Sequence, residues 1–252
     1  MVNARHAANW LVGGVAALIV GGCSGSEPTN QAAAPTSPSA AALPSSTSAA
    51  GASPTAKAIP DSIPAIAFLQ VVDAPGQAKE KPNRLGAGDQ PLPAFCKNSY
   101  EQKDQVGVRA TQLLLFASED APEGSTPKAA VYEDVIVFKN DGATKFMTSL
   151  RKAVEGCPTE KADSGVTLKN SLRGPVEGAG EDSVLIERTR PATDDAGEPV
   201  EGQVHSLFWA AIRQGDTIAF LSNTGWESGS AEKTDTQTLA TRAASRIKAW
   251  RT

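Results

Sequence analysis

The folded part of this chain must begin near residue 60, because the amino-acid composition changes abruptly there. Residues 24–60 are almost wholly Ala, Ser, Thr, Pro, Gly, Asn and Gln, with Glu27 and Lys57 as their charged residues and no aromatic side chain. Such a segment cannot bury enough apolar surface to offset the entropy lost on folding. The residues from Asp61 onward contain every phenylalanine and tyrosine of the chain. We therefore expect a disordered tether over 23–60 and a single globular domain over 61–252.

The first 22 residues have the pattern of an export signal. Arg5 gives a positively charged start, and the apolar stretch Trp10–Val20 is too short to remain as a membrane-spanning helix. The run LIVGGC that ends at Cys23 resembles the lipobox of bacterial lipoproteins, with Val20 where Leu is most usual and Gly21 where Ala or Ser is frequent. This resemblance implies cleavage of the signal peptide 1–22 and acylation of Cys23, by palmitate for example.

An acylated Cys23 would anchor the protein to the extracytoplasmic face of the cell membrane. The alternative is a secreted protein that is cleaved after an Ala-x-Ala-like site, in which Cys23 has no special role. The remaining cysteines, Cys96 and Cys157, would lie in an oxidising compartment, so we expect them to form a disulfide. A cysteine nucleophile is the rival interpretation, but neither cysteine has a Cys-His signature around it and His205 is the only histidine after the signal.

Hydrophobic periodicity predicts an α+β domain with a mostly antiparallel sheet and packed helices. Strands are predicted over the ranges 106–117, 129–138, 183–189, 203–213 and 216–222. Helices are predicted around 65–71, from Asp141 to Gly156, and along the apolar face from Leu239 to Trp250. Both faces of 203–213 are largely apolar, which indicates either a central strand covered on both sides or a strand whose Trp209 lines a groove.

The order of these elements resembles the PknH-like extracellular sensor domain of a mycobacterial serine/threonine kinase, a domain also found in actinobacterial exported proteins. Four segments carry the resemblance: Phe95-Cys96, Val131–Cys157, the loop Gly178–Asp182 and the hairpin Ile212–Ile218. It implies a sheet with helices around a cleft that binds an unidentified ligand. The kinase domain has two disulfides where this chain can form one, so no ligand residue is carried over.

No catalytic, metal or cofactor motif emerges from the sequence. Gly225–Gly229 lacks the G-x-S-x-G spacing of a serine hydrolase, and His205 lies among apolar neighbours, where a satisfied structural histidine is the expected state. The chain has no zinc-binding H-E-x-x-H pattern. Gly178-Ala179-Gly180 precedes a predicted strand, so we interpret it as a turn and not as a dinucleotide-binding loop.

Three acidic pairs remain as candidates: Glu133-Asp134, Glu181-Asp182 and Asp194-Asp195. None has the spacing of an EF-hand, and adjacent strand residues point to opposite faces, so a solvated loop or edge is the expected setting. The net charge of −4 and the absence of a basic run argue against nucleic acid or an anionic lipid surface as a partner.

Trp209 and Trp226 are the ligand-binding candidates, because an exposed tryptophan near a cleft suits a peptide, a glycan or a lipid tail. The alternative is that Trp209 belongs to the core and Trp226 closes a loop. The leading hypothesis is a non-catalytic, lipid-anchored domain that binds a small ligand, a cell-wall fragment or an envelope protein. The rivals are an interaction scaffold without a pocket and a cell-wall hydrolase that uses two converging carboxylates.

Overall fold

The computed structural model describes residues 58–86, 90–194, 198–226 and 229–252. These residues belong to one compact unit, Ser53–Thr252, which contains three clusters of buried apolar side chains and a disulfide. A unit with its own core and crosslink has what a domain needs to fold by itself. The signal segment, Cys23 and nearly all of the expected tether lie outside the described residues.

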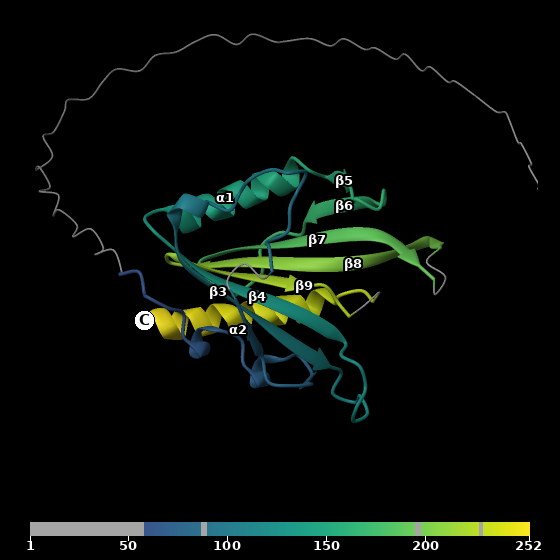
Figure 1. Ribbon diagram of the computed structural model, residues 1–252, viewed down its shortest axis with the longest axis horizontal. Helices are drawn as coiled ribbons and strands as arrows, with labels where there is room; N and C mark the ends of the chain where they lie inside the picture. The colour runs from purple at the N-terminus through teal and green to yellow at the C-terminus, as the bar shows by residue number, and fades with distance from the viewer. Residues whose placement is uncertain (1–57, 87–89, 195–197, 227–228) are drawn as a thin grey trace, which may run out of the picture. The chain divides into compact units, whose positions relative to one another are not determined.

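An antiparallel sheet organises this unit (Figure 1). The strand order among the described residues is β1-β3-β4-β9-β8-β7-β6-β5, and β2 also pairs with β3. The strands are β1 (Gln77–Ala78), β2 (Asn83–Leu85), β3 (Val106–Ala117), β4 (Ala129–Phe138), β5 (Thr159–Lys161), β6 (Thr167–Leu172), β7 (Asp182–Thr193), β8 (Pro199–Gln214) and β9 (Thr217–Asn223). The mostly antiparallel sheet expected from the sequence is confirmed, and β3 and β4 occupy their predicted ranges.

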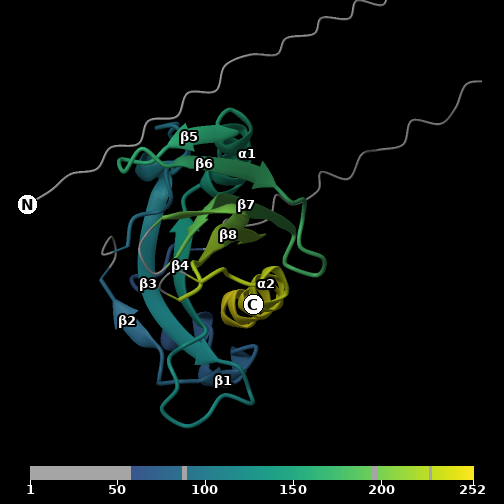
Figure 2. The ribbon, with the colours of Figure 1, turned by 90° about the vertical axis from the view of Figure 1, so that its right-hand side faces the viewer.

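Two α-helices cover the sheet, one on each face: α1 (Gly142–Glu155) and α2 (Lys233–Arg251) (Figures 1 and 2). Phe146, Met147 and Leu150 of α1 are fully buried in one cluster. Leu239 and Ile247 of α2, with the small alanines between them, are buried in the other. Both helices follow the predicted apolar faces, because the 3.6-residue period places these side chains on the side that packs against the sheet.

The strand β8 is covered on both sides, as its two apolar faces indicate. Phe208, Ala210 and Ile212 belong to the cluster that contains α2, whereas Trp209 and Ala211 belong to the cluster that contains α1. Successive side chains of a strand point to opposite faces, so a strand between two helical layers must be apolar throughout. The strand is therefore central, and the alternative in which Trp209 lines an open groove is not observed.

The prediction of a helix around 65–71 is wrong. The segment Ile63–Ala74, called the strap below, contains two single-turn 3₁₀-helices, η1 (Ala65–Ala67) and η2 (Val71–Asp73), separated by extended residues. A third 3₁₀ turn, η3 (Lys103–Gln105), precedes β3. In the strap, the backbone N–H of Leu69 donates to a side chain of β4 and not to a helical carbonyl. A long-range contact therefore replaces the helical hydrogen bond that periodicity predicts.

The polar strands β5 and β6 form one end of the sheet and were not predicted. Their sequences, TEK and TLKNSL, lack a regular apolar alternation, and the two strands together bury one side chain, that of Asn170. Among the described residues, no helix has the length and apolar character needed to span a membrane.

Candidate functional site

The strap is held on the sheet by a clamp of two side chains. The N–H of Leu69 donates to Glu133 Oε2 at 2.8 Å, and the carbonyl of Leu69 accepts from Gln112 Nε2 at 2.7 Å. Gln112 of β3 and Glu133 of β4 are cross-strand partners, and Gln112 Nε2 also donates to Glu133 Oε2 at 3.1 Å. The clamp thus satisfies both backbone polar groups of Leu69, as a neighbouring strand would.

Glu133 is fully buried, and its burial controls its charge. Desolvation raises the pKa of this carboxyl to about 8, although the hydrogen bonds from Leu69 and Gln112 act in the opposite direction. Glu133 Oε1 is buried and has no hydrogen-bond partner among the described residues. The carboxyl therefore carries a proton at neutral pH, and the strap rests on an uncharged group.

A second contact ties the strap to α2. The carboxylate of Asp73 accepts from Arg246 Nε at 2.8 Å and from Arg246 Nη2 at 3.1 Å. Arg242 donates to the backbone carbonyl of Ala74 at 3.1 Å. The strap thus connects β4 to the C-terminal helix, and a movement of the strap must break contacts with both elements.

A groove of about 480 Å³ runs beside the strap. The strap groove, as it is called below, is lined by Ala65, Gln70, Val71, Val72, Lys81, Pro82, Arg84 and Gln112. Val72 is 79% exposed and Val71 is 47% exposed, and the strap also exposes Ile66 at 62%. Exposed apolar side chains that cluster on one short segment are typical of a surface that binds a ligand, a protein or a membrane.

Two cations lie in the strap groove without an acidic partner. The Arg84 guanidinium lies 3.7 Å from the centre of the Phe68 ring and donates to the carbonyl of Ile63 at 3.0 Å. Burial lowers the pKa of Arg84 from its usual value, and the nearby Glu133 opposes that shift. In the described part of the chain, no carboxylate forms an ion pair with Arg84 or with the exposed Lys81. The groove therefore combines an apolar wall with unneutralised positive charge.

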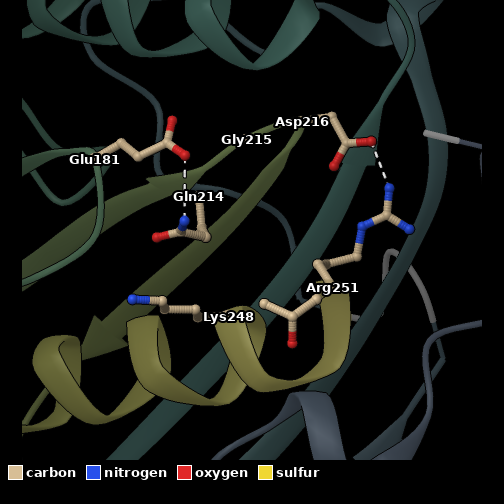
Figure 3. A pocket seen from close by; sticks show the side chains of 7 residues that line it. Glu181, Gln214, Gly215, Asp216, Lys248 and Arg251 are labelled. Atoms are coloured by element: carbon tan, nitrogen blue, oxygen red, sulfur yellow. Dashed lines mark hydrogen bonds and ion pairs between the residues drawn. The ribbon is translucent and has the colours of Figure 1, made fainter. Parts of the chain in front are cut away.

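A second hollow, of about 320 Å³, lies between the β8–β9 turn and the end of α2 (Figure 3). It is lined by Glu181, Gln214, Gly215, Asp216, Lys248, Arg251 and Thr252. Its carboxylates are engaged, because Glu181 accepts from Arg213 at 2.8 Å and Asp216 accepts from Arg251 at 2.5 Å. Unlike the strap groove, this pocket has no aliphatic or aromatic residue among those that line it, so the strap groove is the stronger candidate.

The two tryptophans predicted as ligand contacts do not line either hollow. Trp209 is 5% exposed and packs edge-to-face on Phe95 with ring centres 5.8 Å apart, while the Arg188 guanidinium lies 4.9 Å from its ring. Trp226 is half-buried in the loop after β9, and its Nε1 is buried without a partner among the described residues. Trp209 thus belongs to the core, as the alternative interpretation has it.

Sequence reasoning missed the residues of the strap groove. Val71 ends the range 65–71 that was predicted as a helix, and Val72 directly follows it. Lys81 and Arg84 fall in a Pro-rich and Gly-rich loop with no recognisable motif. The run of apolar residues from Ile63 to Val72 was the available signal. It does not separate the side chains that the sheet buries from those that the fold leaves exposed.

Cys96 and Cys157 form a disulfide with an S–S distance of 2.00 Å. The N–H of Cys96 donates to Glu160 Oε2 at 2.9 Å, and Glu160 also forms an ion pair with Arg188. The disulfide therefore joins the loop before β3 to the segment that links α1 with β5. Both sulfurs and a Glu160 oxygen lie within 4.8 Å of one another, but bonded sulfurs offer no thiolate to a metal.

The expectation that Glu133 and Asp134 are solvated is wrong, because both are buried. They point to opposite faces of β4, as adjacent strand residues must. Asp134 Oδ1 accepts from Thr111 Oγ1 at 2.5 Å and from Arg109 Nε at 2.8 Å, and burial raises its pKa. Each carboxyl thus has structural partners of its own, which compensate for its removal from water.

The other polar candidates lie on the surface or at its edge. Glu181 is exposed, and Asp182 forms an ion pair with Arg151 of α1. Asp194 is described, whereas its neighbour, residue 195, lies outside the described residues. The His205 Nε2 is buried without a partner among the described residues, so this histidine is not the fully satisfied one that the sequence predicts.

Comparison with known proteins gives limited results. No family model matches the sequence, and no curated protein sequence matches it. Among solved structures, the chain is similar to the extracellular domain of PknH from Mycobacterium tuberculosis, with 12% sequence identity and a TM-score of 0.48. The similarity covers 73% of this chain and 93% of that one.

Proposed function

We propose that this chain is a non-catalytic, lipid-anchored extracytoplasmic domain of sensor type, which binds a ligand in the strap groove. The observation that carries the proposal is the groove itself. Exposed Val71 and Val72 line it together with Lys81 and Arg84, and the described residues provide no carboxylate that forms an ion pair with either cation. Concave sites that combine apolar walls with a few polar groups are typical of ligand binding. The lipobox-like run at Cys23, the tether and the disulfide support the extracytoplasmic location.

The chemistry of the groove supports binding and not catalysis. Its titratable side chains are Lys81 and Arg84, and the neighbouring Glu133 is occupied in holding the strap. General acid–base catalysis requires a group within hydrogen-bond reach of the reacting atoms, and nucleophilic catalysis requires a nucleophile beside a base. Glu133 and its neighbour Asp134 are adjacent strand residues, so they lie on opposite faces of the sheet and cannot converge on one bond.

A second function remains under consideration because the strap exposes Ile66, Val71 and Val72. An exposed apolar patch also suits an envelope-protein scaffold without a small-molecule ligand. A stable protein interface buries about 1,200–2,000 Å² in total, far more than these three side chains supply. We therefore favour the small ligand, which needs only the volume of the groove.

A ligand screen tests the proposal. The purified unit 53–252, which has its own core and disulfide, is screened by thermal shift against cell-wall fragments, lipids, divalent metals and common metabolites. A ligand that binds the native state raises the melting temperature by mass action. We expect at least one compound to raise the melting temperature and also to shift the amide NMR signals of Val71, Val72 and Arg84. The substitution Val72→Asp should weaken the binding of that compound.

Two other results would count against the ligand proposal. If the compounds that bind shift amide NMR signals of other segments and not those of the strap, the binding site lies elsewhere. A blank screen, combined with a partner protein crosslinked to the strap in the intact envelope, would favour the scaffold.

A further inference from the structure

We propose that the ligand of the strap groove is a single-chain anionic amphiphile. Its hydrocarbon chain lies against the strap, and its carboxylate or phosphate head is bound by Lys81 and Arg84. This inference rests on the proposed function, because it names the ligand class for the same groove.

The apolar half of the site comes from the strap and the residue before β2. Ala65, Val71, Val72 and Pro82 line the groove, and none of these side chains offers a hydrogen bond. Val72 is the most exposed large apolar residue of the described chain, at 79%. A hydrocarbon chain that covers these side chains removes their apolar surface from water, which favours binding in proportion to the area buried.

The anionic half follows from the state of the surrounding charges. Arg84 is oriented by the Phe68 ring and by the Ile63 carbonyl, and this hydrogen bond, its only one within the described part of the chain, leaves most of its N–H donors available. A guanidinium presents paired donors that match a carboxylate or a phosphate, and Lys81 adds a mobile point charge. Glu133 is the carboxyl group that influences the pKa of Arg84. It is buried, and burial raises its own pKa to about 8, so it is protonated at neutral pH.

Asp73, the acidic residue of the strap itself, is also neutralised. Asp73 forms its ion pair with Arg246 of α2, on 2.8 Å and 3.1 Å contacts. Neither Asp73 nor Glu133 therefore competes with a bound anion for Lys81 and Arg84. The groove favours a negatively charged head over a neutral or positively charged one.

The occupant is one molecule and not a bilayer surface. Peripheral binding to an anionic membrane needs a cluster of several basic residues. This chain has a net charge of −4 and no basic run, so its long-range field does not attract such a surface. The two cations that line the groove match a single head group.

Four probes separate the contributions of tail and charge. Unit 53–252 is titrated by calorimetry and by amide NMR with decanoate, with uncharged decanol, with tail-less acetate and with decyltrimethylammonium, each below its micelle concentration. We expect decanoate to bind about tenfold more tightly than decanol, a difference of about 1.4 kcal/mol. Acetate and the cationic surfactant should not shift the amide signals of Val71, Val72 and Arg84.

Variants at exposed positions test the named contacts without disturbing the core. Lys81→Gln should reduce the preference for decanoate over decanol, and Lys81→Glu should abolish it. Val72→Asp should weaken both ligands, because it places a charge in the tail site. Lys161→Gln, an exposed lysine on β5 at the other end of the sheet, is the matched control and should leave both affinities unchanged.

The outcomes separate this inference from the proposed function. Equal affinity for decanoate and decanol, or no effect of Lys81→Glu, overturns the anionic class. A different screened compound that shifts the groove amides overturns the inference and leaves the function standing, whereas a groove that no compound shifts overturns both. Val72-dependent binding to phosphatidylglycerol vesicles without binding of monomeric decanoate would instead show a membrane-docking surface.

Discussion

Glu133 illustrates how burial sets the charge of a single residue. It lies in the middle of β4, where its carboxyl is removed from water and holds the backbone of Leu69. Its surroundings contain Asp73 of the strap, which raises its pKa, and Arg84 of β2, which lowers it. Desolvation outweighs both effects, because the charged form loses its hydration and receives only two hydrogen bonds in exchange.

A pH titration of stability tests this description. The folded-state pKa of Glu133, about 8, exceeds its ordinary value of 4.5, so the folded state holds the proton more tightly than the unfolded state. Its contribution is therefore fully present below about pH 4.5 and is lost as the pH rises through 8. We expect Glu133→Gln, which remains neutral, to gain stability relative to the wild type between pH 5 and 8, by on the order of 1 kcal/mol per pH unit, and the difference to level off above that range.

The measurement is the free energy of unfolding in urea at several pH values. Glu80→Gln, which alters an exposed carboxylate shortly after the strap, is the control and should parallel the wild type. A constant difference between Glu133→Gln and the wild type at every pH would contradict the assignment of a protonated carboxyl.

At the scale of elements, the disulfide fixes the loop before β3 to the end of α1. Cys96 and Cys157 are separated by 61 positions in the sequence. Closing a loop of that size stabilises the native state by about 4 kcal/mol in the chain-entropy model. We expect Cys96→Ser to lower the melting temperature by on the order of 10 °C under non-reducing conditions.

Calorimetry of the wild type and Cys96→Ser, each with and without reductant, provides the check. The double variant Cys96→Ser/Cys157→Ser controls for the free thiol that the single change leaves. An unchanged melting temperature would mean that the crosslink does not stabilise the fold.

The elements differ in how far local sequence specifies them. β3, β4 and α1 follow the predicted ranges because each carries an uninterrupted period that matches a buried face. The strap does not, since its conformation depends on Gln112 and Glu133, which are distant in sequence. The short strands β5 and β6 were missed because their stability comes from pairing, β5 with β6 and β6 with β7, and not from their own apolar pattern.

At the scale of the whole molecule, Cys23 is predicted to decide where the domain resides. It lies outside the described residues and well before the predicted domain in the sequence, so its loss should not change the folding of that domain. We expect Cys23→Ala to move the protein from the membrane fraction to the soluble extracytoplasmic fraction, because a protein without its acyl anchor has no stable membrane attachment.

Cell fractionation, with immunodetection of the domain, measures this redistribution. Gly25→Ala, within the tether, is the matched control and should leave the protein in the membrane fraction. Retention of Cys23→Ala in that fraction would contradict the lipoprotein assignment.

The sequence by itself determined the main strands and helices and the two cysteines available for pairing, and it predicts a boundary between a tether and the domain. These features depend on composition and on local periodicity, and both can be read directly from the amino-acid sequence. Only the tertiary structure decided that Trp209 is core, that Glu133 is buried and that Val71 and Val72 are exposed beside Lys81 and Arg84. Burial and charge depend on which distant segments meet, and the strap meets the sheet through long-range contacts that no local pattern encodes.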